Sequence, residues 1–439
     1  MLHNSELDPP VLKLAKVILS NATILADCTP GKPAHGATAN GAAAGPSEHS
    51  AARGPPPRAV MDAAAALAQA VTEIGAAAAG PENHLKGIAN SCHDVAALAV
   101  VLEFHIARHV PTAPGSSVTI DSLAHAAGIS PRRLASALGL LFLKGVFQEP
   151  QPGWVAHTNT SLVLARDTDL GAFLRHCTHE AFPAAAALAP ALRRHPDSEE
   201  PHQAAFNVAF RTEDPLFKWL QNRPERFANF NAGMRGIAKG REGSEQQMVR
   251  IFPWETLGEA TVVDIGGGNG HISIALATAF PQLKCLVQDL RGAIEDGRAA
   301  LPEPLRERVT FQEHDMFDPQ PIGHADVYLL RHVLHDWPDA HAARIVARLV
   351  PALRPGARVL VADFVVPPPG ALNGIHNRII RYLDMQMMVL HNAHERTEED
   401  WAAVLRRADH RLKVVKVWKT GDGIGAGTLI EAQLVEVEG

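Results

Sequence analysis

The stretch Thr261-Val-Val-Asp-Ile-Gly-Gly-Gly-Asn-Gly-His271 decides the fold of this chain. An apolar run that ends in Asp264 predicts a strand, and glycines follow it at positions 266, 267, 268 and 270. Residues 272–280 then have the pattern of a helix. Glycines at a strand-to-helix turn let a ligand approach the backbone closely, and the start of the helix offers unpaired N–H groups. The stretch therefore predicts a ligand-binding turn in an α/β sheet.

Asp289 ends the next predicted strand, nineteen residues after Gly270. A carboxylate at this position is suited to accept hydrogen bonds from a ribose diol. The glycine spacing is not Gly-x-Gly-x-x-Gly and no Lys-Ser or Lys-Thr follows, so a dinucleotide or a nucleoside triphosphate fits less well. The turn and Asp289 together favour S-adenosylmethionine as a nucleoside-type cofactor, over a tight turn that only permits packing.

From Thr261 onwards, apolar strand-like runs alternate with helical stretches. The runs lie at 261–265, 284–287, 309–311, 325–330 and 357–366, and the helical stretches at 270–280, 292–301, 339–353 and 376–390. This alternation predicts a parallel sheet with helices on both faces. After a helix at 397–408, two late strands at 412–418 and 428–437 predict an antiparallel pair at the end of the sheet.

The N-terminal half is predicted to be helical. Within residues 119–165, a short helix, a turn with Ser130 as N-cap and Pro131 at the first helical position, a second helix and a two-stranded wing give a winged-helix outline. The predicted organisation is an N-terminal helix (1–29), a flexible Pro/Gly/Ala linker (30–59), a winged-helix domain (60–169), a helical connector and substrate-pocket region (170–255) and a catalytic domain (256–439).

Composition excludes several classes of protein. The 439 residues carry 41 Lys and Arg against 47 Asp and Glu, a formal net charge of -6, so the chain has no general attraction for nucleic acid or anionic lipid. Its 4 cysteines form no CxxC pair, which argues against disulfides and structural zinc. Residues 11–26 are too short and too polar for a membrane span. We expect a soluble, cytoplasmic protein with no nucleic-acid or membrane partner and no metal.

Two further motifs contain candidate catalytic and substrate-binding residues. Leu330-Arg-His-Val-Leu-His-Asp-Trp places His335 after a strand, where an imidazole can take a proton from a phenol or enol, although a structural histidine is equally compatible with the pattern. In residues 382–397, Met388 and Asn392 recur at helical spacing, and Glu395 is placed to hold an imidazole. A core methionine stripe and a helix-start charge are the alternatives.

These motifs, in this order, resemble the caffeic acid O-methyltransferase-like family from about residue 60 to the end of the chain. The resemblance rests on the blocks Asp-Ile-Gly-Gly-Gly-Asn-Gly, His-Asp-Met-Phe, His-Asp-Trp and Glu-Arg-Thr, and the sequence Asn-Ala-His-Glu-Arg-Thr-Glu-Glu-Asp-Trp is similar to the fungal secondary-metabolism branch. It implies a class I methyltransferase with a Rossmann-like sheet and an N-terminal all-helical winged-helix dimerisation domain, and hence a homodimer.

The resemblance also implies roles for individual residues. The cofactor-binding set comprises Asp264, Gly266 and Gly268 around S-adenosylmethionine, Asp289 on its ribose, Asp315 and Met316 beside the adenine, and Arg331 near the cofactor. His335 is implied as the general base, with Asp363 and Glu395 as its orienting carboxylates, and Met388 and Asn392 match substrate-contacting positions. Asp363 stands where plant members usually carry Glu, so its shorter arm is expected to hold His335 less firmly.

The implied activity is S-adenosylmethionine-dependent methylation of a phenolic or enolic hydroxyl on a small secondary metabolite. The main alternative is a non-methylating cyclase or pericyclase that keeps S-adenosylmethionine as a fixed positive charge; His335 can also donate a hydrogen bond in such chemistry. A binding-only homologue that acts through its dimer interface is a further alternative. A DNA-binding regulator is disfavoured, because residues 131–144 offer only three basic side chains.

Overall fold

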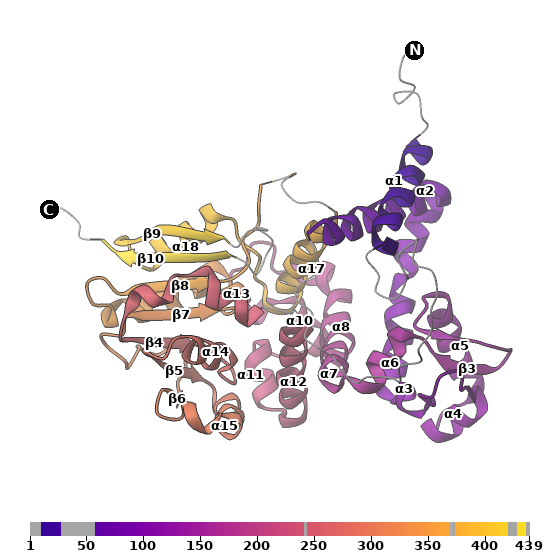
Figure 1. Cartoon of the computed structure of the whole chain (residues 1–439), viewed down its shortest axis with the longest axis horizontal. Helices are drawn as coiled ribbons and strands as arrows, with labels where there is room; N and C mark the ends of the chain where they lie inside the picture. Colours follow the sequence, from indigo (N-terminus) through magenta and orange to yellow (C-terminus); the bar gives the residue numbers. More distant parts are fainter. Residues whose placement is uncertain are drawn as a thin grey trace, which may run out of the picture. The chain divides into compact units, whose positions relative to one another are not determined.

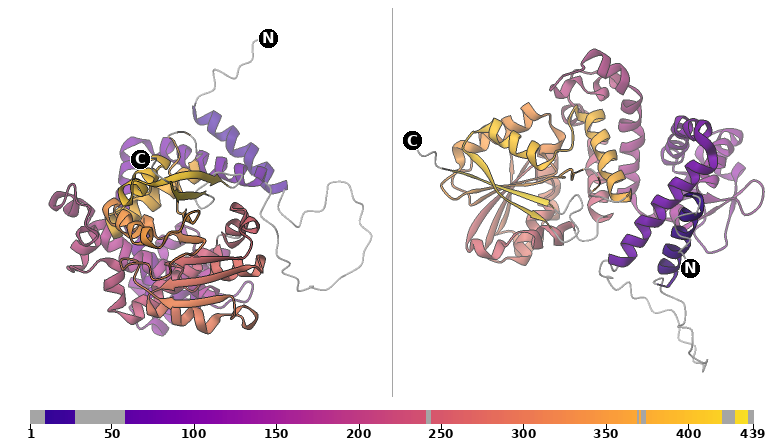
Figure 2. Two further views of the ribbon diagram at one scale, coloured as in Figure 1. Left: turned by 90° about the vertical axis from the view of Figure 1, so that its left-hand side faces the viewer. Right: turned by 90° about the horizontal axis from the view of Figure 1, so that it is seen from above.

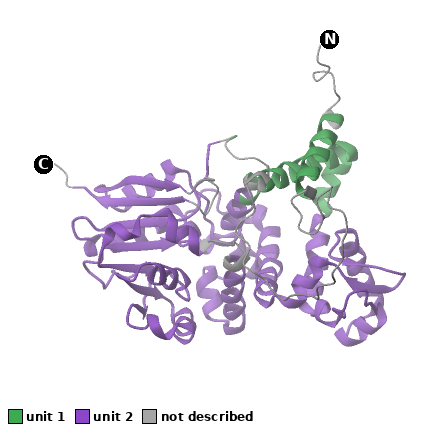
Figure 3. Cartoon of the chain, viewed as in Figure 1, with its two compact units in different colours: residues 1–90, 369–379 green, residues 91–368, 380–439 purple. Residues whose placement is uncertain are grey.

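The computed structural model describes residues 10–27, 58–240, 244–368, 370, 374–419 and 428–435. The chain divides into two compact units, one drawn from residues 1–90 and 369–379 and the other from residues 91–368 and 380–439 (Figure 3). The second unit therefore contains the winged-helix outline of residues 119–165 together with the helical connector and the sheet, whereas residues 60–90 of the domain predicted at 60–169 belong to the first unit. The linker predicted for residues 30–59 lies outside the described residues except for its last two positions.

Two long helices form the described N-terminal part. Helix α1 spans Pro10–Asp27 and α2 spans Arg58–Glu103, which confirms the helices predicted there. Gly80 has a φ of 73° and precedes Pro81, so α2 is kinked at this point. By length and composition alone, Asp62–Glu103 is long and apolar enough to cross a membrane; it is the one such helix among the described residues.

The winged helix is built from short elements of the second unit. They are β1 (Val118–Thr119), α4 (Ile120–Ala127), α5 (Pro131–Leu143), β2 (Phe147–Gln148) and β3 (Trp154–His157). Antiparallel pairing of β2 with β3 confirms the predicted wing, and β1 joins β3 as a third strand that two residues were too few to reveal. Pro131 occupies the first turn of α5 as predicted, but the side chain of N-cap Ser130 makes no capping hydrogen bond.

Short helices connect the winged helix to the sheet. They are α6 (Asn159–Arg166), α7 (Thr168–His176), a π-helical turn (Cys177–Ala181), α8 (Phe182–Ala186), α9 (Leu188–Arg194), α10 (Ala205–Phe210), α11 (Leu216–Gln221), α12 (Pro224–Gly240) and α13 (Ser244–Ile251), whereas α3 (Ile106–His109) precedes β1. Helix α12 packs closely on α7, because a Cβ atom at Gly236 would lie 2.6 Å from the backbone of Asp169. Glycine at this position allows the two backbones to touch.

A seven-stranded sheet forms the C-terminal part of the second unit (Figure 1). Its strands are β4 (Ala260–Ile265), β5 (Leu283–Asp289), β6 (Val309–Glu313), β7 (Val327–Arg331), β8 (Arg358–Ala362), β9 (Leu412–Lys419) and β10 (Thr428–Leu434). The spatial order is β6-β5-β4-β7-β8-β10-β9, in which β4 to β8 are parallel and β10 is antiparallel to both neighbours. The predicted strands and the antiparallel end of the sheet are confirmed.

Helices cover both faces of this sheet (Figure 2). They are α14 (His271–Ala279), α15 (Arg291–Ala300), α16 (Asp339–Leu349) and α18 (Glu398–Ala408), as the sequence predicts. Helix α17 (Gly374–His391) confirms the helix predicted at 376–390, but its Val389 and Leu390 pack against the connector helices instead of the sheet. Neighbouring residues of β4 alternate between the two faces, so Val262 and Val263 belong to different apolar cores. The strand order reverses between β4 and β7, and ligands of such sheets bind in the crevice at the carboxyl ends of these strands.

Strand β9 forms one edge of the sheet. Lysines recur along it at positions 413, 416 and 419. The ammonium group of Lys416 lies 3.4 Å from the ring centre of Trp418, and Lys419 Nζ lies 2.5 Å from Glu398 Oε1. The edge strand is therefore charged along its length.

Candidate active site

The glycine turn (residues 266–270) follows β4 at the reversal point of the sheet. Gly266 has a φ of 68°, and its N–H donates to the carbonyl of Gln288 at 2.8 Å. A Cβ atom at position 266 would lie 2.7 Å from Val333 Cγ2, so no side chain fits there. Gly268 has a φ of 60° with open space on its Cβ side. The turn thus exposes backbone where a ligand would approach.

Asp264 lies beneath this turn and is buried, with 2% of its surface exposed. Its Oδ2 accepts a hydrogen bond of 2.7 Å from Ser273 Oγ, which ties the end of β4 to α14. Burial raises the pKa of Asp264 to about 6. The structure therefore places Asp264 as a support of the turn.

Asp289 connects the end of β5 to the glycine turn. Its Oδ2 accepts 2.7 Å from Gly268 N, its Oδ1 accepts 2.7 Å from Leu290 N, and burial raises its pKa. Each carboxylate oxygen accepts one backbone bond and keeps a lone pair for a further donor. A carboxylate beside an open glycine turn fits an adenosyl cofactor whose ribose hydroxyls donate to it.

The other predicted cofactor residues follow neighbouring strands. Asp315 and Met316 come after β6, where exposed Asp315 Oδ1 accepts 2.9 Å from Phe317 N and Met316 packs on the apolar core. Arg331 is the last residue of β7, and its positive charge acts on Asp264. The topology brings all of these residues to the same edge of the sheet.

The histidine turn (residues 332–337) follows β7. His332 has a φ of 52°, which ends the strand, and Leu334–Asp336 form a single 3₁₀ turn. His335 is buried at 7% exposure, and its Nδ1 lies 2.9 Å from Glu395 Oε1. The second oxygen of Glu395, Oε2, is buried without a hydrogen-bond partner.

Negative charge surrounds His335. Burial disfavours its imidazolium form, but the carboxylates of Asp336, Glu395 and Asp363 outweigh burial and raise the pKa of His335 to about 10. Asp336 Oδ1 lies 3.7 Å from His335 Nε2 and 3.6 Å from Nε2 of His391. Burial raises the pKa of Asp336 to about 7 and lowers that of His391 to about 3, so the His391 ring is neutral at pH 7.

Asp363 contacts the backbone of the histidine turn. Its two oxygens accept from Val333 N at 3.2 Å and from Leu334 N at 3.1 Å, and burial raises its pKa. Its short side chain therefore holds the turn. Of the two predicted carboxylates, Glu395 is the one that accepts a hydrogen bond from the imidazole ring. The structure brings His335, Asp363 and Glu395 together although they lie far apart in sequence.

Met388 and Asn392 lie at the end of α17. Met388 is partly buried, and Asn392 has a φ of 55° and ends the helix. The side-chain nitrogen of Asn392 donates to the carbonyls of Ser198 at 2.9 Å and of Glu200 at 3.1 Å. This nitrogen is thus engaged within the chain, and a substrate would meet the remaining amide oxygen.

Sequence reasoning missed Asp336, His391 and Arg396 as members of this site. Asp336 is the chain neighbour of His335, and Arg396 is the chain neighbour of Glu395. This adjacency to a predicted site residue is the signal that could have identified them. Among the described residues, the ligand atoms of His332, His335 and Asp363 converge within 4.8 Å of one another, as a metal would require. Both Asp363 oxygens and His335 Nδ1 are already engaged in the bonds described above.

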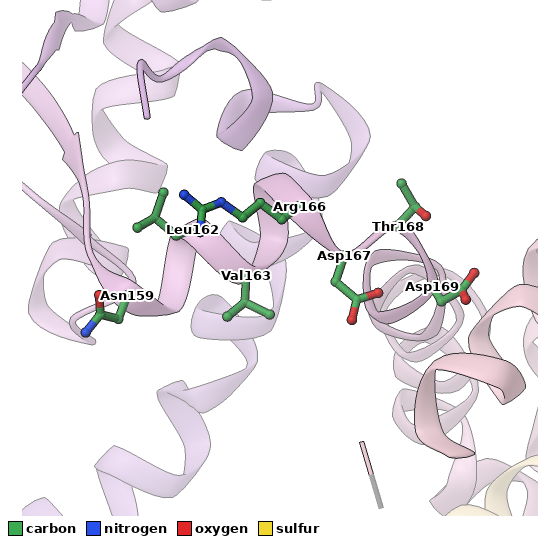
Figure 4. A pocket seen from close by; sticks show the side chains of 7 residues that line it. All are labelled: Asn159, Leu162, Val163, Arg166, Asp167, Thr168 and Asp169. Atoms are coloured by element: carbon green, nitrogen blue, oxygen red, sulfur yellow. The ribbon is translucent and has the colours of Figure 1, made fainter. Parts of the chain in front are cut away.

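A surface hollow lies elsewhere, where α6 meets α7 (Figure 4). Asp169 lies 3.6 Å from Arg235, and the hollow is lined by Asn159, Leu162, Val163, Arg166, Asp167, Thr168 and Asp169. None of the predicted site residues belongs to it, so the candidate site is defined by the two turns and not by this hollow.

Comparison with known proteins agrees with this geometry. The profile of the O-methyltransferase domain family matches residues 188–411. The O-methyltransferase bik3 of Gibberella fujikuroi is 34% identical over 359 residues, 81% of this chain and 77% of that protein. The crystal structure of OxaC in complex with SAH and oxaline matches with a TM-score of 0.78 at 23% identity, over 97% of this chain and 99% of OxaC.

A third comparison concerns the alternative chemistry. A structure described as a pericyclic reaction enzyme matches with a TM-score of 0.72 at 20% identity, over 96% of this chain and 100% of that chain. At these identities the two structures establish the fold alone. The family profile and the identity with bik3 establish more: the chain belongs to the O-methyltransferase family found in fungal secondary metabolism and is an S-adenosylmethionine-dependent methyltransferase.

Proposed function

We propose that this enzyme methylates a phenolic or enolic hydroxyl of a small secondary metabolite and that His335 removes the hydroxyl proton. The observation that carries the proposal is the buried hydrogen bond of 2.9 Å between His335 Nδ1 and Glu395 Oε1. Because Nδ1–H donates to the carboxylate, the neutral ring keeps its lone pair on Nε2. Nε2 is then the atom that accepts the proton.

The acidity of the acceptor supports a phenol or enol. When bound, S-adenosylmethionine supplies a methyl group on a positively charged sulfur. The carboxylates around His335 raise its pKa, so its neutral ring takes up a proton more readily than an ordinary imidazole. A phenol or enol is acidic enough to give up its proton to such a base, whereas an aliphatic hydroxyl is a far weaker acid. The three surrounding carboxylates stabilise the imidazolium that forms.

The experiment combines methyl-labelled S-adenosylmethionine with a panel of phenolic and enolic metabolites. His335→Ala tests the base, and His410→Ala is the matched control, since the His410 side chain is 80% exposed. We expect labelled product from the wild type and His410→Ala, and a loss of about 10²–10⁴-fold in His335→Ala. Equal labelling by His335→Ala contradicts the base assignment.

The same assay separates the non-methylating alternative. That alternative has support from the fold shared with the pericyclic reaction enzyme. A substrate that isomerises in the presence of cofactor while no label moves would favour it. The retained His335–Glu395 pair favours methyl transfer.

We further propose a homodimer that uses the N-terminal helices. Helix α1 exposes four large apolar side chains, at Leu12, Val17, Leu19 and Ile24. Leu19 is the most exposed of them at 72% and lies seven residues from Leu12, on the same face of the helix; exposed apolar side chains that share a face are typical of a surface that packs on a partner. Light scattering of Leu19→Asp is expected to show a shift from dimer to monomer; an unchanged mass would contradict this role of α1.

A further inference from the structure

Arg396 is a fully buried charge beside the candidate base, with 0% of its surface exposed. Its guanidinium donates from Nη1 to the carbonyl of Leu334 at 3.0 Å and from Nη2 to the carbonyl of Trp337 at 2.6 Å. These two carbonyls stand on either side of His335 in the chain. One side chain thus bridges the two ends of the short segment that carries the imidazole.

The buried charge of Arg396 is compensated on its other sides. Its Nε donates to Asp339 Oδ1 at 2.8 Å, and its guanidinium carbon lies 4.8 Å from the ring centre of Trp401. The Trp401 ring is fixed in turn, because its Nε1 donates to the carbonyl of Phe364 at 3.1 Å. A buried guanidinium whose three nitrogens each donate a hydrogen bond has little freedom to move.

The histidine turn is therefore held from two sides. Asp363 accepts the N–H groups of Val333 and Leu334, and Arg396 donates to the carbonyls of Leu334 and Trp337. Glu395, the chain neighbour of Arg396, holds the ring of His335. Because residues 395 and 396 are adjacent, any shift of Arg396 relative to the turn also shifts Glu395 relative to the imidazole.

We propose that Arg396 is a positioning residue for His335, which fixes the segment 334–337 at the place where Glu395 can hold the imidazole. The inference rests on the proposed role of His335 as the base. A planar guanidinium can reach two carbonyls and a carboxylate at once. A lysine ammonium keeps the positive charge but lacks this planar arrangement of N–H donors. Arg396→Lys therefore separates geometry from charge.

The test compares Arg396→Lys with Arg358→Lys. Arg358 is the matched control, since its Nε donates to Glu431 Oε1 at 3.0 Å on β8 and β10, outside the histidine turn. We measure kcat, the KM for S-adenosylmethionine, the pH–rate profile and the melting temperature. Arg396→Lys is expected to lower kcat by about 10- to 100-fold with the cofactor KM within about twofold, because small misplacements of a reacting group have effects of this size.

The pH profile distinguishes positioning from a purely structural role. A loosened Glu395–His335 bond lowers the pKa of His335, so the acidic limb of the profile moves to lower pH in Arg396→Lys. Arg358→Lys is expected to lose thermal stability with an unmoved limb. An Arg396→Lys enzyme with a wild-type kcat and pH–rate profile overturns the proposal. An enzyme whose activity falls only in proportion to its unfolded fraction also overturns it.

Two further variants keep the test decisive. If Arg396→Lys does not fold, Asp339→Asn weakens the hydrogen bonding of Arg396 from the side of its carboxylate partner, whose side chain is 33% exposed. The acidic limb of the pH–rate profile is expected to shift in the same direction. In a His335→Ala background, Arg396→Lys should lower the rate no further. A fully active His335→Ala would refute the general base itself, whereas an inactive His335→Ala beside an unaffected Arg396→Lys would refute only the role of Arg396.

Discussion

The glycine turn after β4 and the histidine turn after β7 stand at the carboxyl ends of neighbouring strands, yet they are built in different ways. The glycine turn is shaped by its own backbone, in which Gly266 and Gly268 adopt positive φ angles, and it is tied to the adjacent end of β5 by hydrogen bonds to Gln288 and Asp289. The histidine turn is held by side chains from distant parts of the chain, Asp363, Glu395 and Arg396. Cofactor binding therefore depends on local chain chemistry, whereas placement of the base depends on the completed fold.

The largest expected effect is on catalysis by the histidine turn, with cofactor binding at the glycine turn nearly unchanged. His335→Ala should lower kcat by about 10²–10⁴-fold and leave the dissociation constant of S-adenosylmethionine within about threefold, because the histidine contributes to proton transfer. Calorimetry of cofactor binding beside turnover measurements checks this. A large loss of cofactor affinity in His335→Ala would show that the two turns do not act separately.

The second prediction concerns the place where Gly266 of the glycine turn meets Val333 of the histidine turn. Gly266→Ala forces an alanine into a positive φ and drives its Cβ toward Val333 Cγ2, at 2.7 Å. We expect a loss of about 2–4 kcal/mol in the free energy of unfolding, and both weaker cofactor binding and lower kcat.

The control for this variant is a second change in the opposing turn. Adding Val333→Ala to Gly266→Ala removes the methyl group in the way and should restore part of the stability, although the strain at residue 266 stays. Denaturant unfolding of the single and double variants measures the coupling. Strictly additive losses would show that the contact between the turns is unimportant.

A third prediction concerns the charge around the base. In Glu395→Gln the neutral amide no longer stabilises the imidazolium, so the pKa of His335 falls from its raised value of about 10 by about 1–3 units. The neutral ring is the active form, so the acidic limb of the kcat profile should move to lower pH by that amount. Maximal kcat falls because the ring is less firmly oriented. An unmoved limb would remove Glu395 from the titration.

The smallest expected effect lies under the glycine turn. Ser273→Ala removes the 2.7 Å hydrogen bond to Asp264 and should lower the free energy of unfolding by about 1–2 kcal/mol at pH 7. Because burial raises the pKa of Asp264 to about 6, acidification toward pH 5 neutralises this carboxyl and should shrink the loss. Urea unfolding at the two pH values checks this, and a loss that grows on acidification would contradict it.

The two turns also differ in how far sequence could predict them. The glycines and Asp289 can be predicted from the sequence because strand, turn and helix follow one another along the chain. The hydrophobic periods of these elements place the glycines and Asp289 at one edge of the sheet. The hydrogen bond between His335 and Glu395 joins residues sixty positions apart, and no local period predicts it. The family resemblance named Asp363 as an orienting carboxylate, but only the fold shows that it holds the backbone of the turn and not the ring.

The N-terminal part teaches the same lesson at the level of secondary structure. The helices and the wing follow from periodicity, whereas β1 is too short to have a period and depends on pairing with β3.

At the end of α17, the amide of Asn392 likewise has no local signal for its bonds to the carbonyls of Ser198 and Glu200, since tertiary packing brings the two segments together.

The lysine-bearing edge strand has a consequence for the behaviour of the protein at high concentration. An outermost strand offers unpaired backbone groups to which a second chain can add, and this is a common start of aggregation. Lysines 413, 416 and 419 along β9 make such an addition bring like charges together. The β9 edge is thereby protected against edge-to-edge association, so crowding or concentration should not extend the sheet through this strand from one molecule to the next.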